Sequence, residues 1–476
     1  MIQAMATTEA GQDPGPRPGR IVMYVFNDAT LDSRVRREAA TLAAAGHTVT
    51  LLATAIDPEA SAIERERVDG FEIIRVPTPR GWRQPWSLRR RSVGRLTKAI
   101  RRRPLDLADL PGATGSLLLA LSLSAARGLY LGGSRATGRA AGQAAWPPSN
   151  LAWLLTWRYA ILGWARAAAA AAPAADVHHG HDLTGLPAAL QAARRDGAPA
   201  VYDSHEIFVD SGSNASRPGW ARRLLRRMER RWSGRTAALV TVNQAYARVL
   251  TARLKPRRTV IVHNCPPRWD PAGPQSDRLR VAAGVPAGAP LILYHGAFSL
   301  NRGLEQLAAA ILEPGLEAAH LVYLGYGGQR ALVEELVADP RTAGRVHLVD
   351  AVPPEELLEM VSGADVDAIP LQPSTLNHWL CTPNKLFESL TAGVPVIVSD
   401  FPVMRGIVLD DSGGPLGGVC DPAQPASIAG AIRAILELAP DDRAALRERC
   451  LAAARERWNW ETESRGLLQL YADLLA

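Results

Sequence analysis

Three polar residues spaced within one helical turn could hold a nucleotide diphosphate and its ribose. Asn384, Lys385 and Glu388 lie in the stretch 382–400. A helix N-terminus presents unpaired N–H groups and a positive dipole end, so it can bind an anion such as a diphosphate. Lys385 would add a positive charge there, and Glu388, one turn later, could accept two hydrogen bonds from a ribose diol. The spacing therefore predicts a sugar-nucleotide site.

The neighbouring residues predict the helix that such a site requires. Thr382 is a good N-cap, and Pro383 fits the first helical position, where its missing N–H costs nothing. Gly393 lies where a left-handed C-cap is expected, and Pro395 prevents the helix from continuing. The apolar run 394–398 then predicts a short buried strand. The alternative is an ordinary amphipathic helix in front of a strand.

Short apolar strands alternate with helices along most of the chain. The pattern begins with a strand–helix–strand unit at 21–53, recurs over 176–264, and restarts at 291 after a Pro- and Gly-rich stretch. It predicts an α/β fold whose parallel sheets are covered on both faces. We expect a disordered tail at 1–19, a first domain at 20–265, a linker at 266–289, a second domain at 290–455 and a C-terminal helix at 456–476.

Charged residues directly follow the first strand, at 21–26. Ligands of open α/β sheets bind beyond the carboxyl ends of the strands. Asp32, Arg34 and Arg37 are therefore expected to face the cleft. The alternative is that these charges only solvate the start of a helix.

Composition favours two domains and acidic partners. The chain has 476 residues, 47% of them hydrophobic, and a formal net charge of +7. A basic balance favours nucleotide diphosphates, anionic lipid heads or nucleic acid, although the basic runs lack a recognised nucleic-acid module. The four cysteines have no metal-type or framework spacing. No secretion signal and no apolar run of roughly 18–20 residues is present, so we expect a cytoplasmic protein, soluble or peripheral to a membrane.

Two segments combine tryptophan with arginine. An insertion at about 80–170 is basic at its start and later contains four tryptophans, of which the last three could share one face of a continuous helix: Trp146, Trp153, Trp157 and Trp164. In 220–235 an apolar residue recurs every four positions between arginines. Such helices could lie on an anionic membrane. The alternative is a pair of core helices with a solvated basic side.

Several of these strings resemble glycosyltransferase family 4, whose members are retaining enzymes of the GT-B fold. The resemblance covers 20–55, 176–264 and 291–475, and its motifs are Asp-Ser-Arg-Val at 32–35, His-Gly-His-Asp at 179–182, Asp-Ser-His-Glu at 203–206, Thr-Val-Asn at 241–243, His-Asn at 263–264 and Pro-Asn-Lys-Leu-Phe-Glu at 383–388. It implies two Rossmann-like domains with parallel sheets facing across a cleft. It also implies a C-terminal tail that crosses back onto the first domain.

The chain departs from the family pattern at three places. Glu388 matches the second glutamate of a pair spaced eight residues apart, but the first falls at Leu380. A loop arginine of the family falls at Ala297, while Arg302 occupies the position of its lysine. The glycine pair after the first strand is absent. The chain looks like a branch that keeps only the Pro-Asn-Lys-x-x-Glu form.

Transfer from a nucleotide sugar requires stabilisation of the departing diphosphate. Without a metal, the protein must supply fixed positive charge and backbone donors. Arg302, Lys385 and the N–H groups of Asn384 and Lys385 are the candidates. Glycines allow a close approach of the backbone to the nucleotide, although they also occur in ordinary tight turns; the candidates are Gly296, Gly325 and Gly327.

On the acceptor side, His181 matches the family histidine that points into the cleft near the transferred sugar. His205 and Glu206 are the next candidates, and structural histidines are the alternative. The run 178–181 contains three histidines but no carboxylate or cysteine at the usual metal-ligand spacing. We therefore expect no metal and no cofactor.

The resemblance implies a metal-independent retaining glycosyltransferase. Its donor would be a UDP- or GDP-linked sugar, and its acceptor a carbohydrate or a lipid-linked, cell-envelope glycan intermediate at the inner face of the cell membrane. Two alternatives stay open: a non-catalytic GT-B scaffold or binding subunit, favoured by Leu380 and Ala297, and a GT-B sugar-nucleotide epimerase. Fold alone assigns neither the donor sugar nor the acceptor.

Overall fold

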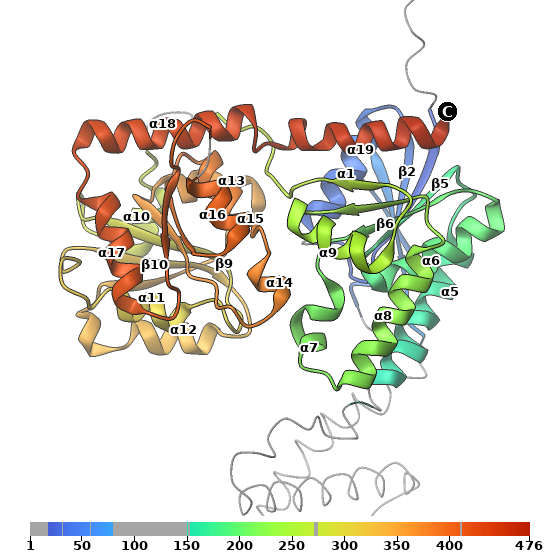
Figure 1. The fold of residues 1–476 in the computed structure, drawn as a ribbon, viewed down its shortest axis with the longest axis horizontal. Coiled ribbons are helices and arrows are strands. Elements are labelled where there is room, and N and C mark those ends of the chain that lie inside the picture. Colours follow the sequence, from blue (N-terminus) through green and yellow to red (C-terminus); the bar gives the residue numbers. More distant parts are fainter. Residues whose placement is uncertain are drawn as a thin grey trace, which may run out of the picture.

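The computed structural model describes residues 18–30, 32–57, 59–79, 150, 153–270, 275–409 and 412–476. These residues form two α/β domains that lie side by side, each built on one sheet (Figure 1). The predicted pair of Rossmann-like domains with parallel sheets is confirmed.

The N-terminal sheet has the strand order β3-β4-β2-β1-β5-β6-β7-β8. All neighbouring strands pair in parallel except β3 and β4, which pair antiparallel. The strands are β1 (Arg20–Tyr24), β2 (Thr48–Thr54), β3 (Glu64–Val68), β4 (Phe71–Val76), β5 (Val177–His181), β6 (Ala200–Ser204), β7 (Ala238–Thr241) and β8 (Thr259–Ile261). The helices are α1 (Ser33–Ala44), α5 (Leu162–Ala171), α6 (Asp182–Asp196), α7 (Gly212–Ala215), α8 (Gly219–Ser233) and α9 (Gln244–Leu254).

The C-terminal sheet has the order β11-β10-β9-β12-β13-β14, and all of its pairs are parallel. Its strands are β9 (Leu291–Ala297), β10 (His320–Tyr326), β11 (Val346–Asp350), β12 (Val366–Ile369), β13 (Val396–Ser399) and β14 (Gly417–Cys420). The helices are α10 (Arg278–Ala283), α11 (Leu304–Ala310), α12 (Arg330–Val337), α13 (Pro354–Ser362), α14 (Leu376–Trp379), α15 (Asn384–Thr391), α16 (Pro402–Leu409), α17 (Pro425–Leu436), α18 (Pro440–Glu456) and α19 (Trp460–Leu475).

Each sheet buries both of its faces because successive side chains of a strand point to opposite sides. In β1, Ile21 and Met23 belong to the core beneath α1 and α19, whereas Val22 and Tyr24 belong to the core beneath α5 and α6. Helix α10 falls within the expected linker, and its Leu279 is buried in a core of the C-terminal domain.

The described tryptophans of the insertion lie in the protein core. Trp153, Trp157 and Trp164 expose 8%, 6% and 0% of their surface. Trp157 packs against Phe208 and Trp232, and Trp164 packs edge-on against Phe26. The predicted membrane-surface helix is therefore wrong for these three residues. Trp146 and most of the insertion lie outside the described residues.

The second predicted membrane helix, α8, also packs on the core. Ala221 and Leu225 are buried, and Leu224, Met228 and Trp232 contact the same core from its edge. Helical periodicity does not distinguish a core face from a lipid face, because both repeat every 3.6 residues. Within the described part of the chain, no helix combines the length and the apolarity that crossing a bilayer requires.

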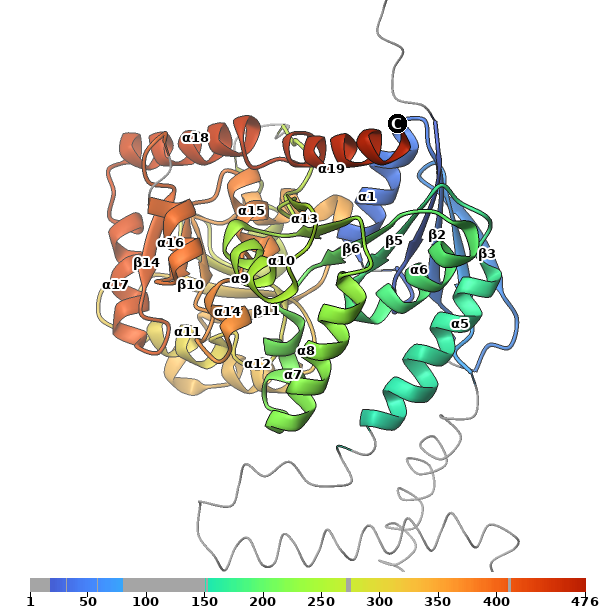
Figure 2. The same cartoon turned by 45° about the vertical axis from the view of Figure 1, so that its right-hand side comes forward.

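Helix α19 leaves the C-terminal domain and lies along the N-terminal one, and both views show α18 and α19 as one band across the two domains (Figures 1 and 2). Trp460 donates its indole N–H to Thr41 at 2.7 Å, and Tyr471 lies 2.7 Å from Nδ1 of the buried His179. Leu467 and Leu470 complete the core beneath α1.

A second contact joins the domains at α14. Asn377 accepts a hydrogen bond from Ile207 N through its side chain and another from the Tyr246 hydroxyl through its carbonyl. Asn243 donates to Leu380 O at 2.9 Å. Leu380 itself packs against the core of the N-terminal domain. The position of the missing glutamate therefore belongs to the domain interface.

The Tyr471→Phe variant should test how much α19 stabilises the N-terminal domain. Losing the hydroxyl leaves Nδ1 of a fully buried His179 unsatisfied, so the free energy of unfolding should fall by about 1–3 kcal/mol. Urea unfolding measures this change. Tyr326→Phe is the matched control, because Tyr326 is 51% exposed and its variant should unfold as the wild type does. Equal stability of both variants would contradict the prediction.

Candidate functional site

Helix α15 begins at Asn384, and its first turn faces the region between the domains. Pro383 takes the N-cap position in an extended conformation, with no side-chain cap, so the prediction of Thr382 as N-cap is off by one residue. Thr382 instead accepts a hydrogen bond from Asn243 of the N-terminal domain. Gly393 follows the helix with φ +70°, the left-handed conformation that the sequence predicts.

Lys385 is a buried amine without a hydrogen-bond partner. Only 9% of the residue is exposed, and Nζ lies 3.4 Å above the ring centroid of Tyr294. Its alkyl chain passes Gly296, where an added Cβ would lie 3.6 Å from Lys385 Cε. Burial lowers the pKa of Lys385 to about 7, although the carboxylates of Asp367 and Glu388 favour its charge. Lys385 thus holds up to three donors for an anion at the start of α15.

Glu388 lies in a chain of charged contacts that the sequence does not reveal. His295 Nε2 is 3.0 Å from Glu388 Oε2, and His295 Nδ1 is 3.3 Å from Asp367. Burial disfavours the imidazolium, but the two carboxylates outweigh it and raise the pKa of His295 to about 9. Glu388 keeps 22% of its side chain exposed. His295 therefore orients a carboxylate that can still reach a ligand.

Sequence reasoning missed His295 because its partners are distant in the chain. The only local signal is its place at the carboxyl end of β9, next to Gly296. Asp367 also serves the site, whereas the nearby Asp365 holds the backbone N–H of Leu291. Asp365 thus has a structural role, whereas Asp367 supports His295.

The glycines predicted to contact a nucleotide are required by the backbone of the sheet. A Cβ at Gly325 would lie 2.0 Å from Gly296 O, and one at Gly327 would lie 2.4 Å from Phe298 O. Gly296 adopts φ +98°. Close packing of β9 and β10 thus accounts for Gly325 and Gly327. Arg302 lies in the loop after β9, where Nε donates to Ser299 Oγ at 3.1 Å.

Arg34 lies inside the N-terminal domain and not at its cleft. The residue is 3% exposed, and its guanidinium donates to both oxygens of Asp203 and to Val262 O. Asp32 caps α1 by accepting from Val35 N. The prediction that Arg34 faces the cleft is therefore wrong, because its charge is compensated within the fold. Arg37 donates to Asn264 and to the carbonyl of Cys265.

His181 and His205 lie together at the carboxyl ends of β5 and β6. His181 Nδ1 is 3.2 Å from His205 Nε2, and His181 is fully buried. His205 also lies 3.2 Å from Asp203 and 3.6 Å from Asp182. Burial lowers the pKa of His181. Asp182 and His205 are partly exposed, and Glu206, the residue after His205, is exposed.

Four buried residues in this domain have the types that bind metals. Their ligand atoms lie within 4.8 Å of one another: Glu38, His179, His181 and Asp203. Both Glu38 oxygens and Nε2 of the two histidines lack hydrogen-bond partners. However, Arg34 lies 3.0 Å from Glu38 and 3.1 Å from Asp203, and His205 is a second cationic neighbour. A divalent ion would add uncompensated positive charge to the buried site, so these four residues do not fit a metal site.

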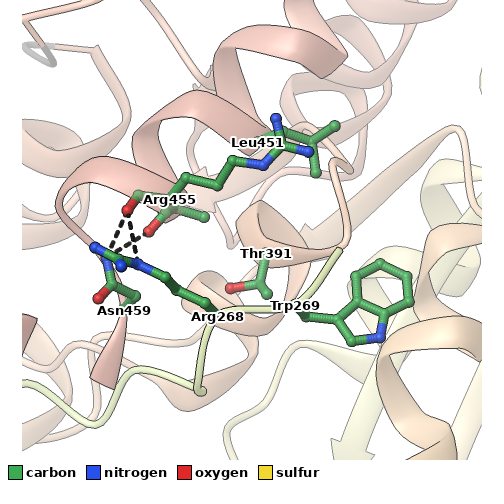
Figure 3. Close-up of a pocket in the computed structure, with 7 residues that line it drawn as sticks. Arg268, Trp269, Thr391, Leu451, Arg455 and Asn459 are labelled. Carbon is green, nitrogen blue, oxygen red and sulfur yellow. Dashed lines mark hydrogen bonds between the residues drawn. The ribbon is translucent and has the colours of Figure 1, made fainter. Parts of the chain in front are cut away.

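A small pocket lies at the junction of α18 and α19 (Figure 3). It is lined by Arg268, Trp269, Thr391, Leu451, Ala454, Arg455 and Asn459. Arg268 and Asn459 both donate to the carbonyl of Arg455. Thr391 is at the opposite end of α15 from Lys385. The pocket therefore belongs to the junction between the linker and the band of α18 and α19, and contains none of the predicted site residues.

Comparison with known families assigns both domains. Residues 130–265 match the model described as Glycosyltransferase Family 4, and residues 275–457 match Glycosyl transferases group 1. The chain belongs to glycosyltransferase family 4. Within the family it is 30% identical, over 197 residues, to a D-inositol 3-phosphate glycosyltransferase of Xylanimonas cellulosilytica, with 41% of this chain and 45% of that protein aligned. The chain thus spans about half the length of the curated relatives it matches.

Solved structures show that this family 4 chain has the GT-B fold. The sucrose-phosphate synthase of Thermosynechococcus elongatus superposes with a TM-score of 0.61 at 17% identity, covering 96% of this chain and 99% of that one. The Anabaena protein HepE, in complex with UDP-glucose, superposes with a TM-score of 0.60 at 12% identity, covering 96% and 100%. At these identities the likeness concerns the fold alone.

The charge pair of His295 can be tested by Asp367→Asn. The raised pKa of His295 means that its ion pairing stabilises the fold fully below about pH 6.5 and is lost as the pH rises through about 9. The variant should therefore lose about 1–3 kcal/mol of unfolding free energy at pH 6 and progressively less toward pH 9.5. Urea titrations at several pH values measure this. Asp365→Asn is the control, because the unfolding free energy that it loses should not change as His295 titrates. An equal pH dependence of the loss in both variants would refute the assignment.

Proposed function

We propose that the chain is a retaining glycosyltransferase that takes a sugar from a UDP- or GDP-linked donor without a metal ion. The observation that carries the proposal is the buried amino group of Lys385, which has no hydrogen-bond partner at the start of α15. A buried unpaired charge is costly, so its presence beside unpaired helical N–H groups supports a site built for an anion. The diphosphate of a nucleotide sugar has that chemistry.

The surrounding residues support the same donor. Arg302 lies in the loop after β9, and its field contributes to lowering the pKa of Lys385, so the two cations share one region. Two cations and helical N–H groups would stabilise the charge that develops on the departing diphosphate. Glu388, held through one oxygen by His295, would accept hydrogen bonds from the ribose. The UDP-glucose bound by HepE favours UDP over GDP for the first experiment.

The acceptor side of the proposed reaction lies at the carboxyl ends of β5 and β6. We assign the binding of a carbohydrate, or of a lipid-linked glycan intermediate, to the region of His205 and Glu206. His181 would position His205, because their ring nitrogens lie 3.2 Å apart. The contacts of α14 with Ile207 and Tyr246 bring this edge to the C-terminal domain.

Lys385→Met should separate binding from stability. Calorimetric titration with UDP and then GDP, with a chelator present, should give binding of one nucleotide by the wild type and roughly ten- to hundred-fold weaker binding by the variant. Because the lysine pKa near 7 must rise when a diphosphate binds, wild-type binding at pH 8 should take up protons, which two buffers of different ionisation enthalpy reveal.

The same variant should be more stable than the wild type without ligand. Replacing a buried amine by an apolar side chain of similar length removes its desolvation cost, so unfolding free energy at pH 6 should rise by about 1–2 kcal/mol. Lys255→Met is the control, since Lys255 is exposed. Failure of both UDP and GDP to bind wild type would reject the donor site and favour a non-catalytic scaffold.

We also propose that the protein works at the inner face of the cell membrane, attached through α8. The arginines on its exposed side are Arg223, Arg226, Arg227, Arg230 and Arg231. The only acid of α8, Glu229, is buried and accepts a hydrogen bond from Tyr202. Each exposed arginine near anionic lipid can contribute about 1 kcal/mol. The surface is therefore electrostatic, while the apolar side of α8 packs on the protein core.

Charge reversal on α8 tests this attachment. The wild type should co-sediment with vesicles of anionic lipid at low salt and dissociate from them as the salt concentration rises. The triple variant Arg223→Glu, Arg227→Glu, Arg230→Glu should remain in the supernatant. A matched triple variant on the C-terminal domain, at Arg341, Arg405 and Arg455, should still pellet. Equal sedimentation with neutral vesicles would contradict an electrostatic surface.

A further inference from the structure

Asp182 is a carboxylate at the proposed acceptor edge that the described part of the fold leaves without a hydrogen bond. Asp32 caps α1, and Asp203 is bound by Arg34. Asp182 accepts no hydrogen bond from any described residue, and its only ion-pair partner among them is His205, with Nδ1 3.6 Å from Oδ2. Its side chain is 32% exposed. Both of its oxygens can therefore accept a hydrogen bond from a ligand.

The backbone holds Asp182 in an unusual conformation. Its φ is +52°, in the left-handed region, although it is the first residue of α6. A non-glycine residue there carries strain that the surroundings must maintain, and such residues gather at functional sites. Glycine would remove the strain, and the chain instead keeps a carboxylate beside His205.

His205 fixes the carboxylate from the other side. It lies between Asp182 and Asp203, and Asp203 is itself held by the Arg34 guanidinium. Burial disfavours a charged imidazole, but the carboxylates of Asp182 and Asp203 outweigh this and raise the pKa of His205 to about 10. His205 is therefore a cation at neutral pH and cannot accept a proton from a substrate. At this edge the partly exposed Asp182 and the exposed Glu206 remain as carboxylates that could accept the proton.

We propose that Asp182 binds the attacking hydroxyl group of the acceptor and takes its proton. This inference rests on the proposed function. In the step, the hydroxyl oxygen forms a bond to C1 of the donor sugar on the same face from which the diphosphate departs, as retention requires, and the bond from C1 to the diphosphate oxygen breaks. The electron pair of the broken bond leaves with the diphosphate, and the hydroxyl proton passes to an oxygen of Asp182. In hydrolysis of the donor, water takes the place of the hydroxyl.

The groups around Asp182 suit this task. Burial raises the pKa of Asp182 to about 6. His205 opposes this rise, and the nearby carboxylates of Glu206, Asp203 and Asp32 add to it. A carboxylate with that pKa is ionised at pH 7 and is a better proton acceptor than an ordinary aspartate. The free carboxylates Asp182 and Glu206 also favour a neutral polyol at this point over an anionic group.

Asp182→Asn is the variant that tests the proposal. Asparagine keeps the size of the side chain and tolerates the left-handed backbone. With UDP-glucose, UDP-galactose, UDP-N-acetylglucosamine and GDP-mannose as donors and water as the acceptor, the variant should bind the nucleotide within two-fold of wild type. Its hydrolysis of whichever donor the wild type cleaves should fall by about a hundred-fold. The wild-type rate should decline below about pH 6, and the residual rate of the variant should not.

The control is Asp176→Asn. Asp176 lies just before the opposite end of β5 and pairs with Arg20 at the surface. The variant should hydrolyse the donor at the rate of the wild type. Hydrolysis by Asp182→Asn within three-fold of wild type, or an unchanged decline below pH 6, would overturn the proposal. So would wild-type protein that binds nucleotide yet hydrolyses no donor. Absence of nucleotide binding would instead reject the proposed function itself.

Discussion

The N-terminal domain depends on one buried ion pair, Arg34 with Asp203. The guanidinium joins α1 to β6 and, through the carbonyl of Val262, to the segment after β8. Removing either partner would leave an uncompensated buried charge, a change that typically costs about 3–5 kcal/mol. Asp203, together with Asp182, raises the pKa of His205 against the effect of burial. A pair buried inside the domain thus affects the charge of His205 at the carboxyl end of β6.

The C-terminal domain uses the opposite arrangement. Arg34 has its partners within the fold, whereas Lys385 has an aromatic ring beneath it and no hydrogen-bond acceptor. The first cation stabilises the domain, and the second is kept at a cost that a bound anion would repay. The two domains therefore handle buried charge differently: one compensates it internally, and the other leaves it available to a ligand.

The sequence predicts the elements better than their partners. Alternating strands and the signals around Pro383 and Gly393 place the two sheets and α15, because these signals are local. His295 escapes notice because its partner Glu388 is 93 positions away. The tryptophan stripes are misread because a core face and a membrane face have the same helical period. Arg34 is misplaced because burial of a charge depends on Asp203, a residue on another strand.

The band formed by α18 and α19 has a consequence for how the chain folds during synthesis. Domains usually fold as units, the N-terminal one first. Here the core beneath α1 includes Leu467, Leu470 and Tyr471, so it cannot close until the second domain has been made. A ribosome-bound chain would expose that apolar surface throughout translation of the C-terminal sheet. The core beneath α1 is then completed last, although its first strands are the earliest to be synthesised.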